Sequence, residues 1–339
     1  MKFGLFGGAR SAGEGPVGDS VGYKSFIDHV LLAEELGYES VFVVEHHFTG
    51  VGQVSASLNL LSYLAGRTRR IRLGTAVVVL PWHNPVLLAE QVATLDLLSN
   101  GRFDFGVGKG YREQEFGGFC IPLAEATERF DEAMEVLRKA WAGGARFSHH
   151  GKRWHFDNVV VEPRPTQQPH PPFWIGAGNI DAIGRAGRDG YSLLLDQIAP
   201  VELIVERVKV YRDAVAAAGH SNPQVAVARA LLVANTEEER RAAYATRRKT
   251  FQSFGALARG PGSERYLDPS KLSDADIAND SAALLGNAQD IIVRLKQLEA
   301  GGVDYVILVD PTGSPDNLRM FAQDVMPQFR NTSGRRAAE

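Results

Sequence analysis

Eight short apolar runs, separated by longer stretches with the periodicity of amphipathic helices, constrain the fold of this chain more than any other feature. The runs lie at residues 3–7, 40–45, 71–79, 102–107, 172–177, 191–196, 225–234 and 303–309. Runs such as 40–44 and 305–309 are almost continuously apolar, which is typical of strands in a parallel sheet covered on both faces. Eight strand–helix units predict an α/β protein built as a single (β/α)8 TIM barrel. Because strand number alone does not show closure, an open doubly wound sheet is the alternative.

The helical periodicity between the runs is clearest at 26–36, 86–98, 129–141, 204–217, 237–251, 291–300 and 318–329. Glycines stand just past the last apolar residue of three of these stretches, at Gly37, Gly219 and Gly301. Glycine just past the last apolar residue of a helix favours a left-handed C-terminal cap. We therefore expect these helices to end at those glycines.

Two segments depart from the strand–helix alternation and are expected to be insertions after the fourth and seventh strands. Residues 143–172 contain several prolines together with His149, His150 and His155, and residues 255–286 are rich in Gly, Pro, Ser and Asp. Because a loop this long in a compact domain is usually functional or disordered, we interpret 255–286 as a lid. The rest predicts one domain over residues 1–330, followed by a flexible polar tail at 331–339.

Composition indicates a globular enzyme rather than a nucleic-acid or membrane protein. The chain is 44% hydrophobic, and its 37 basic and 40 acidic residues give a net charge of -3, so no basic field attracts nucleic acid or acidic lipid. No apolar run approaches the roughly 20 residues that span a bilayer, and Met1 to Arg10 lacks the pattern of a signal peptide. Cys120 is the only cysteine, which excludes an internal disulfide and a thiolate zinc site. We expect a cytoplasmic protein.

The polar residues that follow the second run are the first candidates for chemistry. This run ends in Glu45-His46-His47-Phe48. In a (β/α)8 barrel the active site forms at the C-terminal ends of the strands, so His46 and His47 are expected at the barrel mouth. One imidazole could simply satisfy a hydrogen bond in the core, but a carboxylate and two imidazoles together favour a functional role.

Two glycine-containing segments follow neighbouring runs and predict a phosphate site. The first is Gly106-Val107-Gly108-Lys109-Gly110-Tyr111, in which glycines at alternate positions permit close backbone approach and Lys109 supplies a positive charge. Its spacing is not that of a dinucleotide-binding fingerprint, and a tight turn is the alternative. The second is Gly176-Ala177-Gly178-Asn179, where Asn179 is expected to cap a helix whose N-terminus could bind an anion.

A phosphorylated cofactor could bridge the two segments, with a ring system reaching toward His46. Asp181, near the start of the second helix, would repel a phosphate unless its side chain turns outward. A metal site at His149, His150 and His155 is less favoured than a solvated polar loop, because no further ligand stands at a suitable spacing.

These features resemble the bacterial luciferase-like flavin monooxygenases over nearly the whole chain. Five short segments carry the resemblance, in the family's order: Met1-Lys2-Phe3-Gly4, Val44-Glu45-His46-His47-Phe48-Thr49, Leu73-Gly74-Thr75-Ala76-Val77-Val78-Val79-Leu80-Pro81, Ser99-Asn100-Gly101-Arg102-Phe103 and Asp324-Val325-Met326-Pro327. The resemblance implies that reduced FMN, delivered by a separate reductase, and oxygen act on a small organic substrate.

The resemblance also implies roles for individual residues. His46 corresponds to the active-site histidine, and Ala76-Val77 to a non-prolyl cis peptide against which the flavin ring lies. The phosphate would contact Lys109, Gly110 and Tyr111, with lysine in place of the family's arginine, and Ala177, Gly178 and Asn179. A homodimer is expected, because the predicted helices near 56–64 and 87–98 carry more apolar surface than one barrel needs.

Departures from the luciferase pattern argue against light emission from a long-chain aldehyde. Gly108 replaces a reactive cysteine, Gln197 a tryptophan and Gly178 a glutamate, and the substrate itself is not predicted. Two alternatives remain open. One is a deazaflavin-dependent dehydrogenase on the same barrel, and the other is a non-catalytic flavin-binding partner subunit.

Overall fold

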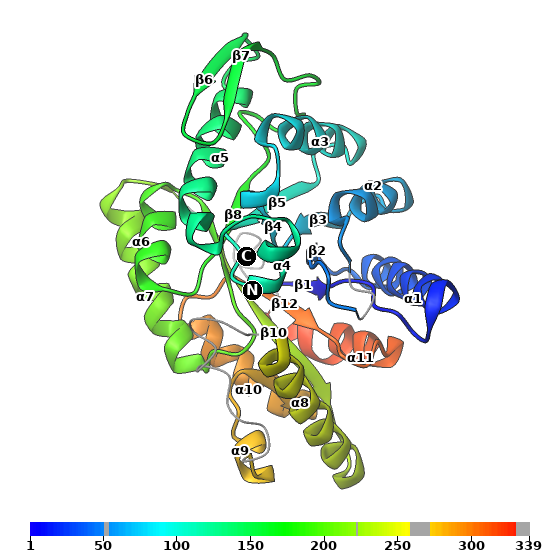
Figure 1. Ribbon diagram of the computed structural model, residues 1–339. Helices are drawn as coiled ribbons and strands as arrows, with labels where there is room; N and C mark the ends of the chain where they lie inside the picture. The colour runs from blue at the N-terminus through cyan, green and yellow to red at the C-terminus, as the bar shows by residue number, and fades with distance from the viewer. Residues whose placement is uncertain (51–53, 222, 258–271, 330–339) are drawn as a thin grey trace, which may run out of the picture.

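A closed barrel of eight parallel strands forms the centre of the molecule in the computed structural model, which describes residues 1–50, 54–221, 223–257 and 272–329 (Figure 1). Its strands are β1 (Lys2–Gly7), β2 (Ser40–Val43), β3 (Arg72–Thr75) with β4 (Val78–Val79), β5 (Phe103–Gly108), β8 (Phe173–Gly176), β9 (Ser192–Leu195), β10 (Val225–Val233) and β12 (Tyr305–Val309). β1 pairs with both β2 and β12, and β10 pairs with both β9 and β12, so the ring has no open edge. The predicted barrel is confirmed, and the open sheet is excluded.

Each of the eight predicted apolar runs contains a barrel strand, because a strand in this fold buries both of its faces. The inner faces meet in a cluster that includes Phe42, Trp174 and Tyr305. The outer faces join a larger core beneath the surrounding helices, with residues such as Val41 and Val306. The third run is not one continuous strand, since the peptide bond between Ala76 and Val77 is cis and separates β3 from β4.

The helices that cover the barrel are α1 (Gly15–Leu36), α2 (Ser57–Arg67), α3 (Pro85–Leu98), α5 (Ala126–Trp141), α6 (Ile180–Arg188), α7 (Val201–Ala217), α8 (Glu237–Leu257), α10 (Ala288–Ala300) and α11 (Pro315–Met320). α1 begins at Gly15 rather than at the expected residue 26. Its first half lacks an apolar stripe because it packs through glycine: a Cβ on Gly22 would lie 1.7 Å from the carbonyl oxygen of Arg10.

Two of the three predicted glycine caps are confirmed, and one is wrong by a residue. Gly37 and Gly219 adopt left-handed conformations, with φ of 85° and 72°. Gly301 has a φ of -78°, and its N–H still bonds to the carbonyl of Gln297. Gly302, with a φ of 86°, reverses the chain instead. α10 therefore keeps near-helical geometry one residue longer than the apolar pattern indicates.

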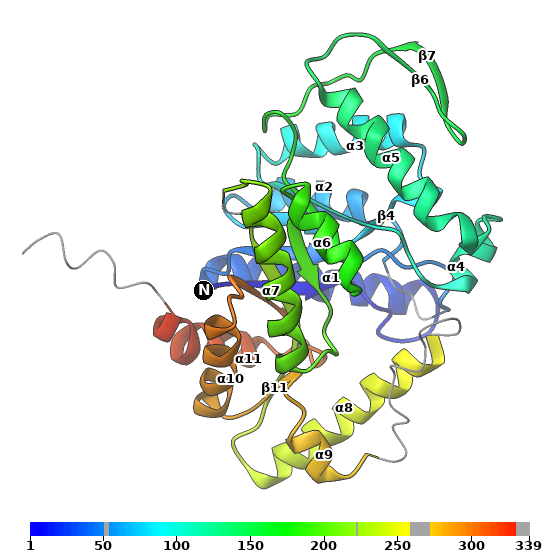
Figure 2. The ribbon, with the colours of Figure 1, turned by 90° about the vertical axis from the view of Figure 1, so that its left-hand side faces the viewer.

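The segment 143–172 forms an antiparallel hairpin between α5 and β8, made of β6 (Phe147–His150) and β7 (His155–Val159), at the top of Figure 2. His149 is buried there and lies 3.2 Å from Glu132, so its assignment to a solvated loop is wrong. The pattern gave no sign of this contact, because Glu132 lies on α5, outside the histidine-rich segment. Within the described residues, no cluster of three or more His, Cys, Asp or Glu side chains could hold a metal ion.

The segment 255–286 contains α9 (Asp274–Ala278) and β11 (Ala283–Gly286). β11 pairs in parallel with the end of β10, outside the ring of eight strands. Residues 258–271, on which the lid prediction mainly rests, lie outside the described residues, as does the tail 331–339. In the described part of the chain, no helix is long and apolar enough to cross a membrane.

Candidate active site

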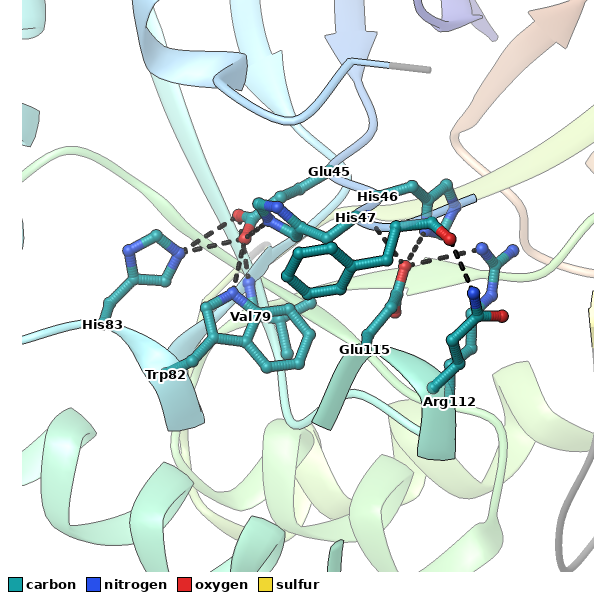
Figure 3. Close-up of polar contacts among 10 residues, drawn as sticks. Glu45, His46, His47, Val79, Trp82, His83, Arg112 and Glu115 are labelled. Atoms are coloured by element: carbon teal, nitrogen blue, oxygen red, sulfur yellow. Dashed lines mark hydrogen bonds and ion pairs between the residues drawn. The ribbon is translucent and has the colours of Figure 1, made fainter. Parts of the chain in front are cut away.

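His46 and Glu115 form a hydrogen-bonded pair at the C-terminal end of the barrel. His46 follows β2, and Glu115 lies on α4 (Glu113–Gly118), a short helix between β5 and α5. Nδ1 of His46 is 3.0 Å from Oε1 of Glu115. A dashed line marks this contact in Figure 3. The same oxygen accepts the backbone N–H of His47 at 3.1 Å, and Nη1 of Arg112 lies 3.5 Å away. Glu115 is almost fully buried, with 4% of its side chain exposed.

This geometry fixes which nitrogen of His46 carries the proton. A carboxylate only accepts hydrogen bonds, so Nδ1 of His46 donates to Glu115. Burial lowers the pKa of His46 below its ordinary value, the hydrogen bond to Glu115 opposes that effect, and the charge of Arg112 adds to it. The ring is therefore neutral near pH 7, and its Nε2 carries a lone pair. Such a group can accept a proton at Nε2.

Beside this pair, the Glu45 carboxylate accepts hydrogen bonds from four donors. Its Oε1 accepts from Nε2 of His47 at 2.9 Å, Nε1 of Trp82 at 2.7 Å and Nε2 of His83 at 3.0 Å. Its Oε2 accepts the backbone N–H of Val79 at 3.4 Å (Figure 3). Burial alone would raise the pKa of Glu45, but the hydrogen bonds from His47, His83 and Trp82 lower it to about 2. Glu45 is thus an ionised carboxylate in the protein interior.

The cis peptide at Ala76-Val77 lies on an apolar floor inside the barrel. Phe6, Ala76, Val77 and Val309 are partly buried and pack against the inner cluster. The cis bond that the resemblance implies is thus present. The contact of these residues with a flavin stays a prediction.

The glycines of β5 and β8 leave room for atoms of the protein itself. A Cβ on Gly108 would lie 2.6 Å from Cγ2 of Val77, and one on Gly176 would lie 2.9 Å from Cγ1 of the same residue. A Cβ on Gly106 would lie 1.7 Å from the carbonyl oxygen of Thr75. The alternating glycines were predicted to admit a ligand, but Gly106 and Gly108 are required by the backbone and side chains around the cis bond.

The two predicted phosphate-binding segments follow neighbouring strands, since β5 pairs with β8. The Lys109 side chain is exposed and donates to Oγ1 of Thr127 at 3.3 Å. Oδ1 of Asn179 accepts the N–H of Ala182 at 2.8 Å, which confirms its predicted role as the cap of α6. Asp181 is exposed in the first turn of α6.

The other residues predicted to bind the phosphate surround these two. Gly110 has a φ of 74°, and a Cβ there would meet Val79 and Phe116. Tyr111 is 46% exposed, with the Arg112 guanidinium 5.6 Å from its ring centre. Ala177 donates its N–H to Leu194, and Gly178 follows directly. Their contact with a phosphate stays a prediction.

Sequence reasoning missed Glu115, Arg112, Trp82 and His83. His83 follows the third strand region, so the rule that found His46 could have found it as well. Glu115 had no usable signal, because a glutamate in the first turn of a helix is usually exposed.

The residues present fit a flavin mononucleotide. The exposed ammonium of Lys109 and the N-terminus of α6 suit a phosphate, and the floor around Ala76 and Val77 suits an aromatic ring. The neutral ring of His46 offers a proton acceptor at the same end of the barrel.

Comparison with known proteins gives the family. The sequence profile of the luciferase-like monooxygenases matches residues 1–305. The oxygenase component of a flavin-dependent trigonelline monooxygenase from Acinetobacter baylyi is 28% identical, covering 91% of this chain and 90% of its own. An FMNH2-dependent dimethylsulfone monooxygenase from Pseudomonas putida is also 28% identical, over 91% of this chain and 88% of its own.

A solved structure supports the same conclusion. The monooxygenase RslO1 from Streptomyces bottropensis superimposes with a TM-score of 0.83 at 27% identity, covering 97% of this chain and all of that one. Some sequence matches are shorter. An uncharacterized Sinorhizobium fredii protein is 34% identical in an alignment that covers 51% of this chain and 49% of that protein, so this chain spans about half the length of that relative. The chain belongs to the luciferase-like monooxygenase family and is a flavin-dependent monooxygenase of that family.

Proposed function

We propose that the chain is the oxygenase component of a two-component system, which uses reduced FMN from a separate reductase and O2 to oxygenate a small organic substrate. The observation that carries the proposal is the neutral His46, with a lone pair at Nε2, at the barrel end that also holds the apolar floor at Ala76 and Val77. The two relatives with near-complete alignments are an oxygenase component and an FMNH2-dependent monooxygenase.

The residues of the site divide the work. Reduced FMN, when bound, supplies the electrons that activate oxygen. Lys109 and the N-terminus of α6 hold the phosphate by charge and by free backbone N–H groups. The apolar floor keeps water from one face of the ring. His46 accepts or returns a proton at Nε2, and Glu115 holds its Nδ1 proton in place.

Anaerobic titration of the purified protein with reduced FMN and with a reduced deazaflavin tests the cofactor. We expect saturable binding of FMN and much weaker binding of the deazaflavin. After admission of air, oxygen uptake with each candidate substrate is compared with peroxide release and oxygenated product. Preferential binding of the deazaflavin, with hydride transfer and no oxygen uptake, would support a dehydrogenase instead. Flavin binding with no turnover of any substrate would favour a partner subunit.

A homodimer in the cytoplasm is part of the proposal. Large apolar side chains are exposed on α2 and α3: Tyr63 at 50%, Leu87 at 53%, Leu97 at 42% and Leu98 at 56%. Such side chains gathered on adjacent helices are suited to a symmetric interface. Light scattering at micromolar concentration should give twice the chain mass of 36.9 kDa, whereas a stable monomer would refute the dimer.

A further inference from the structure

We propose that Glu45 is a positioning residue, which holds the flavin-facing segment around Ala76-Val77 in fixed relation to His46. The inference rests on the proposed function, because it assigns Glu45 a role in the same site. Glu45 acts through the residues that it binds.

The hydrogen bonds of Glu45 connect the two parts of the site. Glu45 directly precedes His46, whose side chain bonds to Glu115 on α4. Three of the four donors to Glu45 come from residues 78–83, which directly follow the cis bond: Val79, Trp82 and His83. One buried carboxylate therefore links the backbone next to His46 to residues 78–83, which follow the apolar floor at Ala76 and Val77.

The chemistry of these donors requires a carboxylate. An ionised carboxylate offers only acceptors, and the indole N–H of Trp82 and the backbone N–H of Val79 can only donate. His47 and His83 must then each carry a proton on Nε2. Glutamine keeps one acceptor oxygen but would place an NH2 group against the backbone N–H of Val79 or, with the amide turned over, against the indole N–H of Trp82. A histidine could turn its lone pair toward that amide, but the indole and the backbone N–H have no such choice.

Packing does not replace the carboxylate on the outer side of this segment. A groove of about 350 Å3 lies between α2 and α3, lined by Glu45, Val78, Trp82 and His83 together with residues of both helices. The His83 side chain is 28% exposed. Val78, Val79 and Leu80 are buried and β4 pairs with β5, so along the groove the hydrogen bonds to Glu45 act on Trp82 and His83.

Asp96 supplies a matched control. It is a fully buried carboxylate on α3 and accepts two hydrogen bonds from Gln167, from the backbone N–H at 2.8 Å and the side-chain amide at 2.6 Å. It lies near the C-terminal end of α3, whereas Pro85, at the other end of that helix, follows closely after His83. Asp96→Asn should therefore lower stability without reaching the site.

The experiment compares Glu45→Gln, Glu45→Ala and Asp96→Asn with the wild type. Hydrogen exchange, followed by mass spectrometry of peptides that cover 76–83, reports local opening without any flavin. Binding of oxidised FMN, measured by fluorescence quenching, and the visible circular dichroism of the bound flavin report the floor. We expect exchange in 76–83 to accelerate about tenfold or more and FMN binding to weaken about tenfold in Glu45→Gln, and both to change further in Glu45→Ala.

In Asp96→Asn, the exchange rate in 76–83 and the affinity for FMN should both stay within about twofold of the wild type. This should hold even if the melting temperature falls as much as it does in Glu45→Gln. Wild-type exchange in 76–83 in Glu45→Gln, or equal changes in Asp96→Asn, would overturn the positioning role. If the wild type binds no FMN, the proposed function fails. The exchange measurement still decides whether Glu45 holds the segment.

Discussion

Replacement of Glu115 by glutamine tests how the protein sets the proton on His46. The variant keeps the size of the side chain and one acceptor oxygen, but it removes the negative charge and adds an NH2 donor. In the wild type, Nδ1 of His46 donates to Glu115 at 3.0 Å. In the variant, the amide oxygen can still accept from Nδ1, because the backbone N–H of His47 needs the same acceptor. The tautomer is then kept, and the change beside the ring is the loss of the negative charge.

The magnitudes follow from the same contacts. Glu115 raises the pKa of His46, through its hydrogen bond and its charge, so the pKa of His46 should fall further in Glu115→Gln. Arg112 is only 6% exposed and would lose its carboxylate neighbour. We expect a loss of about 1–3 kcal/mol in the free energy of unfolding.

The assay is a nitrogen-15 NMR titration of the histidine side chains, with oxygenation rates measured once a substrate is identified. Glu113→Gln is the control, because Glu113 is exposed on the same short helix. We expect Nδ1 of His46 to be protonated in the neutral form of all three proteins, and the pKa of His46 to be lower in Glu115→Gln than in the wild type and the control. An unchanged pKa of His46 in Glu115→Gln would show that Glu115 does not set the proton on His46.

Further predictions concern the phosphate site, acid stability and the cis segment. Lys109→Ala should weaken FMN binding by about 1–3 kcal/mol and riboflavin binding far less, and equal losses in calorimetry would place Lys109 away from the phosphate. The pKa of Glu45 lies at about 2, below its ordinary 4.5, so its contribution to stability is complete above pH 4.5 and is lost as the pH falls toward 2. That contribution amounts to about 3 kcal/mol. The free energy of unfolding, measured with urea, should therefore fall less steeply from pH 6 to pH 3 in Glu45→Gln than in the wild type. Gly108→Ala should displace Val77, because the added Cβ would lie 2.6 Å from Cγ2 of Val77. FMN binding should then weaken by more than the lost stability of the flavin-free protein accounts for, and an unchanged affinity for FMN would contradict this.

The barrel could be predicted from the sequence because its strands are apolar on both faces. His46 was found by the rule that barrel chemistry lies at the C-terminal ends of strands, and Asn179 by its side chain at a helix start. The cis bond had no such signal. Ala76 and Val77 are ordinary strand residues, and only the resemblance to the family implied the bond.

The missed residues depend on contacts between distant segments. Glu115 looks like an exposed glutamate until α4 is placed against the end of β2, where its partner His46 lies 69 residues earlier in the chain. His149 looks solvated until the hairpin is placed against Glu132. Periodicity reports which face of an element is buried. It does not report which charged groups two elements bring together.

His46→Ala tests whether His46 transfers a proton in the site. With a substrate in hand, oxygen uptake, hydrogen peroxide and oxygenated product are measured together for the wild type, His46→Ala and His46→Asn, with His47→Ala as the control. We expect both His46 variants to fold and bind reduced FMN, while product per oxygen consumed falls about a hundredfold or more and peroxide replaces it. His47→Ala should lower stability more than coupling, because His47 donates to Glu45. Full coupling and normal turnover in His46→Ala would contradict the proton-transfer role of His46.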